Sequence, residues 1–152
     1  MMNGKSLKSS NTIPIILTVA RLTKQKAIDR LVRVHKRLIE DDIKHKVYVI
    51  GDGEEREDLQ NLIKKLQVVD TFILLGAKSN PYPYFKECDI FTLLSYYEGY
   101  GMVLEEAKTF EKPIVITNTA AKEAIEGYKN SLISDNDENS IYLALKMAIN
   151  NI

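Results

Sequence analysis

Short apolar runs alternate with amphipathic segments from residue 13 to the end of the chain. The apolar runs, rich in β-branched residues, occupy 15–19, 47–50, 72–75, 90–94, 113–117 and 131–134. Segments with helical spacing occupy 26–40, 54–66, 81–86, 102–110, 121–126 and 138–150. Strands alternating with helices form βαβ units, and continuously apolar strands indicate a parallel sheet covered on both faces. The sequence therefore predicts an α/β fold: a doubly wound, Rossmann-like parallel sheet of about six strands.

Composition excludes several classes of protein. With 152 residues the chain is long enough for one domain with its own core. Lys and Arg together number 21, as do Asp and Glu, so the net charge is zero and a nucleic-acid partner is not expected. The single cysteine, Cys88, rules out an internal disulfide framework. No apolar run approaches the ~20 residues of a membrane span.

The chain divides into a polar start and one folded domain. Residues 1–12 contain no apolar core of a signal peptide, and we expect a flexible leader or the artificial end of a longer chain. Residues 13–152 form the domain. His35 and His45 have no second ligand at metal spacing, which predicts structural or exposed histidines and no metal site.

The loops after the first two strands carry charge and glycine. Open parallel sheets bind ligands at the carboxyl ends of their strands. Arg21, Lys24 and Lys26 follow the first strand, as a phosphate site or a solvated basic loop. The second strand ends in Gly51-Asp52-Gly53, but Arg56 stands where the dinucleotide motif GxGxxG needs its third glycine. A tight turn with positive-φ glycines is the favoured interpretation there.

The loops after the third and fifth strands leave two interpretations each. Tyr82 and Tyr84 follow the third strand and could stack on a base or cover an edge of the core. Segment 117–123 follows the fifth strand. Its small polar residues suit either a phosphate or sugar hydroxyl, or an ordinary helix cap.

The segment after the fourth strand, 95–106, carries the most information. Gly99 and Gly101 flank Tyr100 at a strand-to-helix turn, where backbone N–H groups can approach a ligand. Helical spacing places Glu106 on a stripe with Met102, Val103 and Phe110. A carboxylate on an apolar stripe needs a partner, which would be a bound ligand or an ion pair with a cation such as Arg21 or Lys26.

Four motifs together resemble the C-terminal domain of retaining glycosyltransferases of family 4, which have the two-domain GT-B fold. The strongest is 98–107, EGYGMVLEEA, which is similar to the family's E-G-F/Y-G-x-x-x-x-E-A. Segment 19–26, VARLTKQK, is similar to its G-R-L-x-x-x-K-G. Segment 49–53, VIGDG, and segment 80–84, NPYPY, followed by 88–91, CDIF, complete the resemblance. It covers residues 13–150.

The resemblance implies a role for each matching position. Arg21 and Lys26 would bind the donor pyrophosphate and neutralise the leaving nucleotide, and Glu98 would contact hydroxyls of the donor sugar. Glu106 would hold the ribose hydroxyls. The remaining donor-binding positions are the base-proximal Gly76 and Ala77 and the backbone of Gly99, Tyr100, Gly101 and Met102. Ala27 departs from the family's glycine after the lysine, which puts the shape of that turn in doubt.

The implied activity is retaining transfer of a sugar from a nucleotide diphosphate donor to a saccharide or lipid-linked acceptor, without a cofactor or metal, in surface polysaccharide synthesis. The implied partner is an N-terminal acceptor domain that this chain lacks, so we expect the chain alone to be inactive. We expect a cytoplasmic location, with any contact at the inner face of the membrane made by that missing domain. The alternatives are an epimerase or phosphorylase with the GT-B fold and a non-catalytic nucleotide-binding module.

Overall fold

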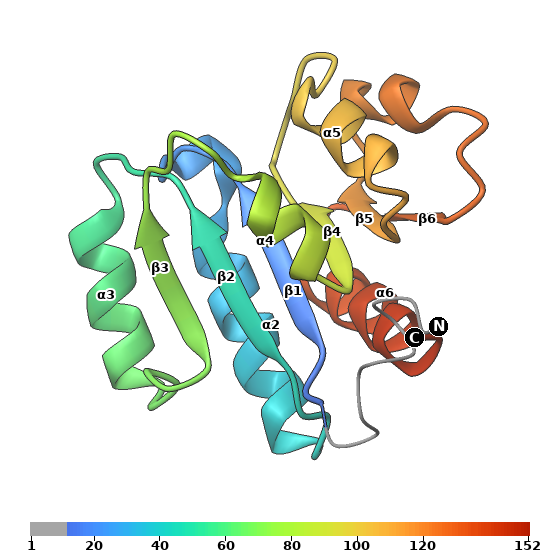
Figure 1. Cartoon of the computed structure of the whole chain (residues 1–152). Coiled ribbons are helices and arrows are strands. Elements are labelled where there is room, and N and C mark those ends of the chain that lie inside the picture. Colours follow the sequence, from blue (N-terminus) through green and yellow to red (C-terminus); the bar gives the residue numbers. More distant parts are fainter. Residues whose placement is uncertain (1–11) are drawn as a thin grey trace.

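The computed structural model describes residues 12–152 and contains one six-stranded sheet (Figure 1). The leader expected over residues 1–12 lies outside the described residues, apart from Thr12. The strands are β1 (Ile15–Val19), β2 (Lys46–Ile50), β3 (Phe72–Gly76), β4 (Ile90–Leu93), β5 (Ile114–Thr117) and β6 (Ser131–Ser134). All six pair in parallel, in the order β3-β2-β1-β4-β5-β6. The predicted doubly wound α/β fold is confirmed.

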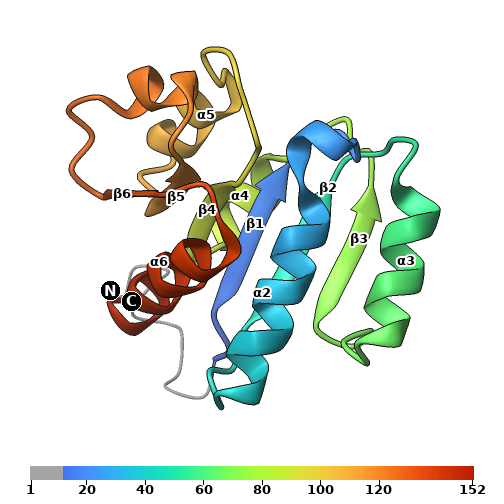
Figure 2. The ribbon, with the colours of Figure 1, turned by 180° about the vertical axis from the view of Figure 1, so that it is seen from behind.

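Three helices cover one face of the sheet: α2 (Ile28–Glu40), α3 (Arg56–Lys65) and α6 (Glu138–Asn150). Figure 2 shows α2 and α6 side by side in front of the central strands. Leu31, Leu59 and Leu145, one from each helix, are buried with strand residues in a single apolar cluster. Burial of side chains of this size stabilises the fold by about 1.5–3 kcal/mol each.

The shorter helical elements cover the opposite face: α4 (Tyr82–Glu87), α5 (Val103–Thr109) and the 3₁₀ helix η2 (Ala120–Ile125). Phe85 of α4 stacks between Phe91 of β4 and Phe110, with ring centroids 5.2 and 5.5 Å apart. Leu104 of α5 and Ile125 of η2 extend this second cluster. Covering on both faces explains why the strands carry continuous apolar runs.

Predicted and observed helices differ mainly at their starts. The helix expected over 26–40 is divided: η1 (Lys24–Lys26) precedes α2, and Ala27 joins them with a left-handed backbone at φ 54°. This is the position where the family pattern has glycine, and an L-residue is strained in a left-handed backbone. The helix expected from residue 54 begins at Arg56, after a turn.

His35 and His45 are both buried and pair with each other, which confirms a structural role. His45 Nδ1 lies 2.9 Å from the Ile43 carbonyl and must donate to it, so its Nε2 accepts from His35 Nδ1 at 2.7 Å. Thr71 Oγ1 then donates to His35 Nε2 over 2.8 Å. Burial, together with His45, lowers the pKa of His35 to about 3, and burial also lowers the pKa of His45.

Candidate functional site

The strand order places the predicted site at a switch point of the sheet. From β1 the chain proceeds to β2 and β3 on one side, then crosses to β4 on the other side of β1. The loops after β1 and β4 therefore leave neighbouring strands in opposite directions, the arrangement at which open α/β sheets bind ligands. Arg21 and Lys26 lie on the first loop, and Glu98 lies on the second.

Lys26 and Glu98 form an ion pair although 72 residues separate them in sequence. The ammonium Nζ of Lys26 donates to Glu98 Oε2, and the side chains are 21% and 9% exposed. Ser95 Oγ donates to the same carboxylate oxygen at 2.6 Å. Two predicted catalytic residues thus meet at the carboxyl ends of β1 and β4. Ser95 was not predicted, although its position three residues before Glu98 is a local signal for such a contact.

Arg21 is exposed, and among residues 12–152 its guanidinium has no hydrogen bond or ion pair. Its backbone, in contrast, is fixed by the turn after β2. A Cβ on Gly51 would lie 1.8 Å from the Ala20 oxygen, and one on Gly53 would lie 2.5 Å from the Leu22 oxygen. Of these two glycines, Gly51 has the predicted positive φ and Gly53 does not. Gly53 is needed instead because two backbone segments approach each other closely there. The GDG turn positions the Arg21 loop.

Gly76 and Ala77 lie at the end of the edge strand β3, with Gly76 at φ 77° and Ala77 exposed. A Cβ on Gly76 would meet only Nη1 of Arg56, at 3.8 Å, so the space above it is open. Three strand spacings separate β3 from β4, roughly 14 Å across the sheet. Gly76 and Glu98 therefore both lie at the carboxyl ends of the strands, but far enough apart that only an elongated ligand would contact both.

The glycine-rich turn after Glu98 packs against η2. A Cβ on Gly101 would lie 2.9 Å from that of Ala121, and Gly101 has φ 77°, so only glycine fits there. Tyr100 OH donates to Glu105 Oε2 at 2.7 Å, which raises the pKa of Tyr100 and lowers that of Glu105. Gly99 is exposed with open space around it, as a backbone that contacts a ligand would be.

Glu106 is half-buried on α5, but the predicted stripe is wrong in part. Met102 is 73% exposed, and the buried side of the helix consists of Leu104 and Ala107. The ion pair with Arg21 or Lys26 is not formed, and within residues 12–152 no hydrogen bond or salt bridge reaches the Glu106 carboxylate. Helical periodicity misplaced Met102 because α5 begins one residue after it.

The other candidate positions are used by the fold. Tyr84 packs on the apolar cluster under α4, and the Tyr82 ring lies 5.6 Å from that of Phe110, which favours the core-edge interpretation. Thr117 Oγ1 donates to the Ser95 carbonyl, and Thr119 Oγ1 accepts from Ala121 N as the cap of η2. The polar residues after β5 are therefore occupied in capping and loop contacts.

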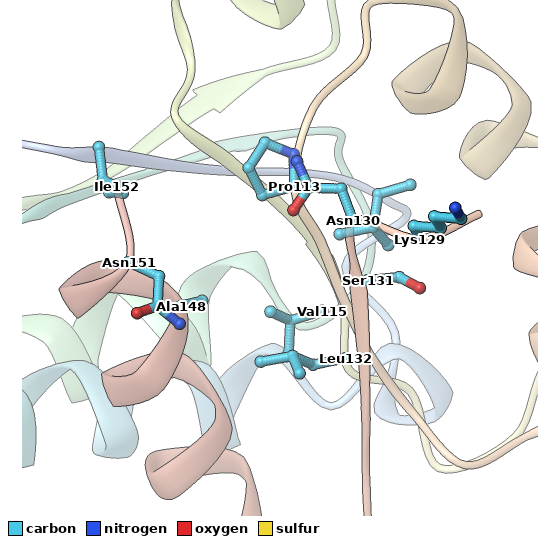
Figure 3. Close-up of a pocket in the computed structure, with 10 residues that line it drawn as sticks. Pro113, Val115, Lys129, Asn130, Ser131, Leu132, Ala148, Asn151 and Ile152 are labelled. Carbon is cyan, nitrogen blue, oxygen red and sulfur yellow. The ribbon is translucent and has the colours of Figure 1, made fainter.

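A cavity of about 240 Å³ lies at the other end of the sheet (Figure 3). Pro113 and Ser131, at the amino ends of β5 and β6, line it together with Ala148 and Asn151 at the end of α6. None of the predicted site residues lines this cavity. Ligands of open parallel sheets bind at the carboxyl ends of the strands, so the cavity is separate from the candidate site.

Comparison with known proteins identifies the family. The sequence profile of the family described as Glycosyl transferases group 1 matches residues 3–151. The chain belongs to this family. A Campylobacter jejuni protein, N-acetylgalactosamine-N,N'-diacetylbacillosaminyl-diphospho-undecaprenol 4-alpha-N-acetylgalactosaminyltransferase, is 34% identical over 134 residues, which are 86% of this chain and 36% of that protein.

Solved structures of similar fold have the GT-B architecture. The lipopolysaccharide outer core galactosyltransferase WaaB superimposes with a TM-score of 0.84 at 21% identity, over 95% of this chain and 42% of WaaB. S. aureus TarM, solved in complex with Fondaparinux, alpha-GlcNAc-glycerol and UDP, superimposes with a TM-score of 0.83 at 22% identity, over 95% of this chain and 30% of TarM.

The chain spans 30–42% of the length of these relatives and matches their C-terminal part. It therefore corresponds to one half of a GT-B fold. Among residues 12–152, no helix is long and apolar enough to cross a membrane.

Proposed function

We propose that this chain is the half of a retaining glycosyltransferase that binds the nucleotide diphosphate sugar, and that the whole enzyme acts in surface polysaccharide synthesis. The observation that carries the proposal is the meeting of Lys26 and Glu98 at the switch point. Arg21 on the loop after β1 and Glu106 on α5, whose side chains have no hydrogen bond or ion pair among residues 12–152, add further charges. Cations for phosphate and carboxylates for hydroxyls are the groups that such a donor requires.

The donor would lie across the carboxyl ends of the strands. Its base would lie near Gly76 and Ala77, its ribose at Glu106, and its pyrophosphate at Arg21 and Lys26. Its sugar would contact Glu98 and the backbone of residues 99–102. The similarly folded TarM was solved in complex with UDP, which supports a nucleotide as the ligand of the whole enzyme.

Transfer would occur with retention at the anomeric carbon. Negative charge builds on the departing nucleoside diphosphate as the glycosidic bond breaks, and preorganised cations stabilise that charge. Arg21 and Lys26 would supply these cations, so no metal ion is proposed for this step. Lys26 also holds Glu98 in place.

The saccharide or lipid-linked acceptor and the transfer itself are assigned to the whole enzyme. The relatives support this assignment, because one is named for a diphospho-undecaprenol substrate and another for the lipopolysaccharide outer core. The proposed location is the cytoplasmic side, where the acceptor half would meet a lipid-linked substrate at the inner face of the membrane.

Calorimetric titration of the chain with UDP, GDP, ADP and NAD tests the donor site. One nucleoside diphosphate should bind, with and without EDTA, and Arg21→Ala and Glu106→Ala should each weaken it about tenfold to a hundredfold. Lys64→Ala and Glu57→Ala, exposed substitutions on α3, are the matched controls. Preferential binding of NAD, or no binding of any nucleotide at millimolar concentration, would contradict the proposal.

A further inference from the structure

The backbone between β4 and Glu98 (the site loop, residues 94–98) is held by side chains from other elements. Arg30 Nη2 of α2 donates to the Leu94 carbonyl at 2.6 Å. Thr117 Oγ1 of β5 donates to the next carbonyl, that of Ser95, also at 2.6 Å. Both bonds are buried, and a lost buried bond costs more than an exposed one.

The two following carbonyls are bound in the same way. Asn136 Nδ2, from the loop between β6 and α6, donates to the Tyr96 carbonyl at 2.9 Å. Gln25 Nε2 of η1 donates to the Tyr97 carbonyl at 3.0 Å, and Tyr96 N donates to the Gln25 carbonyl at 2.9 Å. Four successive carbonyls are thus bound by side chains from four parts of the fold, which leaves the site loop little freedom before Glu98.

Arg30 is the centre of this arrangement. Its side chain is only 3% exposed, its guanidinium lies 4.1 Å from the centroid of the Tyr96 ring, and Nη1 donates to the Asn136 carbonyl at 3.3 Å. Burial lowers its pKa. Within residues 12–152 it has no salt bridge, and its buried Nε has no hydrogen-bond partner. A buried cation held by carbonyls and one aromatic ring, with no carboxylate paired to it, is costly, and its hydrogen bond to the Leu94 carbonyl is what an apolar residue could not supply.

We propose that Arg30 and Asn136 are positioning residues: they hold the site loop so that Glu98 meets Lys26. Arg30 binds the loop at Leu94 and stacks on Tyr96, and Asn136 binds it at Tyr96. Glu98 follows two residues later, where Lys26 and Ser95 reach its carboxylate. The binding of a nucleotide sugar by Lys26 and Glu98 rests on the proposed function. The positioning of the site loop by Arg30 and Asn136 rests only on the contacts described above.

The holding is tested without any nucleotide. Competitive acetylation, read by mass spectrometry, compares the reactivity of Lys26 with that of the exposed Lys64 on α3. Asn136→Ala, at an exposed position, and Arg30→Met should each raise the relative labelling of Lys26 about fivefold, because the ion pair with Glu98 opens more often. Arg30→Lys keeps the positive charge but loses the guanidinium that reaches two carbonyls at once, so it should also raise the relative labelling of Lys26. Asn61→Ala, an exposed asparagine on α3, should leave it unchanged.

A double-mutant cycle on nucleoside diphosphate affinity then separates positioning from general loss of stability. Asn136→Ala should weaken binding about fivefold in the wild-type chain and add nothing in Lys26→Met, because its effect passes through that side chain. Equal weakening in both backgrounds would overturn the proposal, as would unchanged labelling of Lys26 in Asn136→Ala. Increased labelling in a chain that binds no nucleotide would support the positioning role and refute the proposed function, so the two fail separately.

Discussion

Two polar networks at opposite ends of the sheet show how differently one fold treats its polar groups. At the amino ends of β2 and β3, Thr71, His35 and His45 form a chain of hydrogen bonds that ends at a backbone carbonyl. At the carboxyl ends of β1 and β4, Lys26 and Glu98 form an ion pair, and the exposed side chain of Arg21, on the same loop as Lys26, has no partner among residues 12–152. The first network is closed, and the second retains groups that a ligand can recruit.

Burial of polar and titratable groups alone does not mark a functional site. Both histidines have lowered pKa values, yet every ring nitrogen has a protein partner and both rings are buried. Strongly shifted groups in the core also arise from structural networks. The candidate site is instead recognised by charged side chains that are partly exposed and can contact a ligand.

Removal of His35 should have the largest effect, and on stability only. In His35→Leu the acceptor Nε2 of His45 loses its buried donor, and a cavity or strain adds to that loss. We expect the free energy of unfolding to fall by about 3 kcal/mol, measured by urea denaturation, with nucleotide affinity changed less than twofold. Glu40→Ala, an exposed position on α2, should stay within ~0.5 kcal/mol. A large loss of affinity in His35→Leu would show that the two ends are coupled.

Acid should weaken the closed network next. Both histidines are neutral in the folded chain and have lowered pKa values, whereas in the unfolded chain their pKa is about 6.5. Below that pH the unfolded chain binds more protons, so the stabilisation is full above about pH 6.5 and is lost as the pH falls. His35 alone should cost about 2 kcal/mol between pH 8 and pH 5.

Urea denaturation at pH 8, 6 and 5 measures this loss. A chain with both histidines replaced by leucine should be less stable at pH 8 but should lose much less stability between pH 8 and pH 5. An equally steep loss in that variant would assign the pH dependence to other groups.

Lys26→Met should affect the open network in the opposite sense. It removes a cation that is 21% exposed and leaves Glu98, whose side chain is 9% exposed, with the Ser95 hydroxyl, so stability should fall by about 1–2 kcal/mol, less than in His35→Leu. Nucleoside diphosphate affinity should fall about tenfold. Calorimetry and urea denaturation on the same samples compare the two. A stability loss as large as that of His35→Leu would remove the distinction between the networks.

Ala27→Gly should have the smallest effect. Relief of the left-handed strain of about 1 kcal/mol is offset by the loss of a buried methyl group and by a more flexible unfolded chain, so stability should change by less than about 1 kcal/mol. Ala27→Val, with a branched side chain at the same φ, should cost more than the glycine variant by thermal denaturation. If Ala27→Gly instead alters nucleotide affinity, the turn controls where Lys26 points.

Periodicity was sufficient for the fold because each strand and helix is encoded within its own segment. The pattern predicted β1 and α6 with correct bounds. It failed at Met102, where a stripe was extended beyond the start of the helix.

The sequence predicted which residues belong to the candidate site but not which of them contact one another. Motif spacing named Lys26 and Glu98, whereas nothing local shows that residues 72 positions apart would pair. Arg30 has the spacing of a helix residue with no special role, and its function in the site loop follows only from packing with β4 and Asn136. The pairing of His35 with His45 is equally a product of tertiary structure.

The close approach of the GDG turn to the backbone of Ala20 and Leu22 has a practical consequence for engineering. Chimaeras that exchange the loop after β1 between relatives, to alter which donor is used, would place a foreign backbone against Gly51 and Gly53. Two hydrogen bonds, Leu22 N to Asp52 O and Glu55 N to Leu22 O, would then need to re-form. Segments 20–26 and 51–55 thus behave as one module, to be transplanted together or not at all.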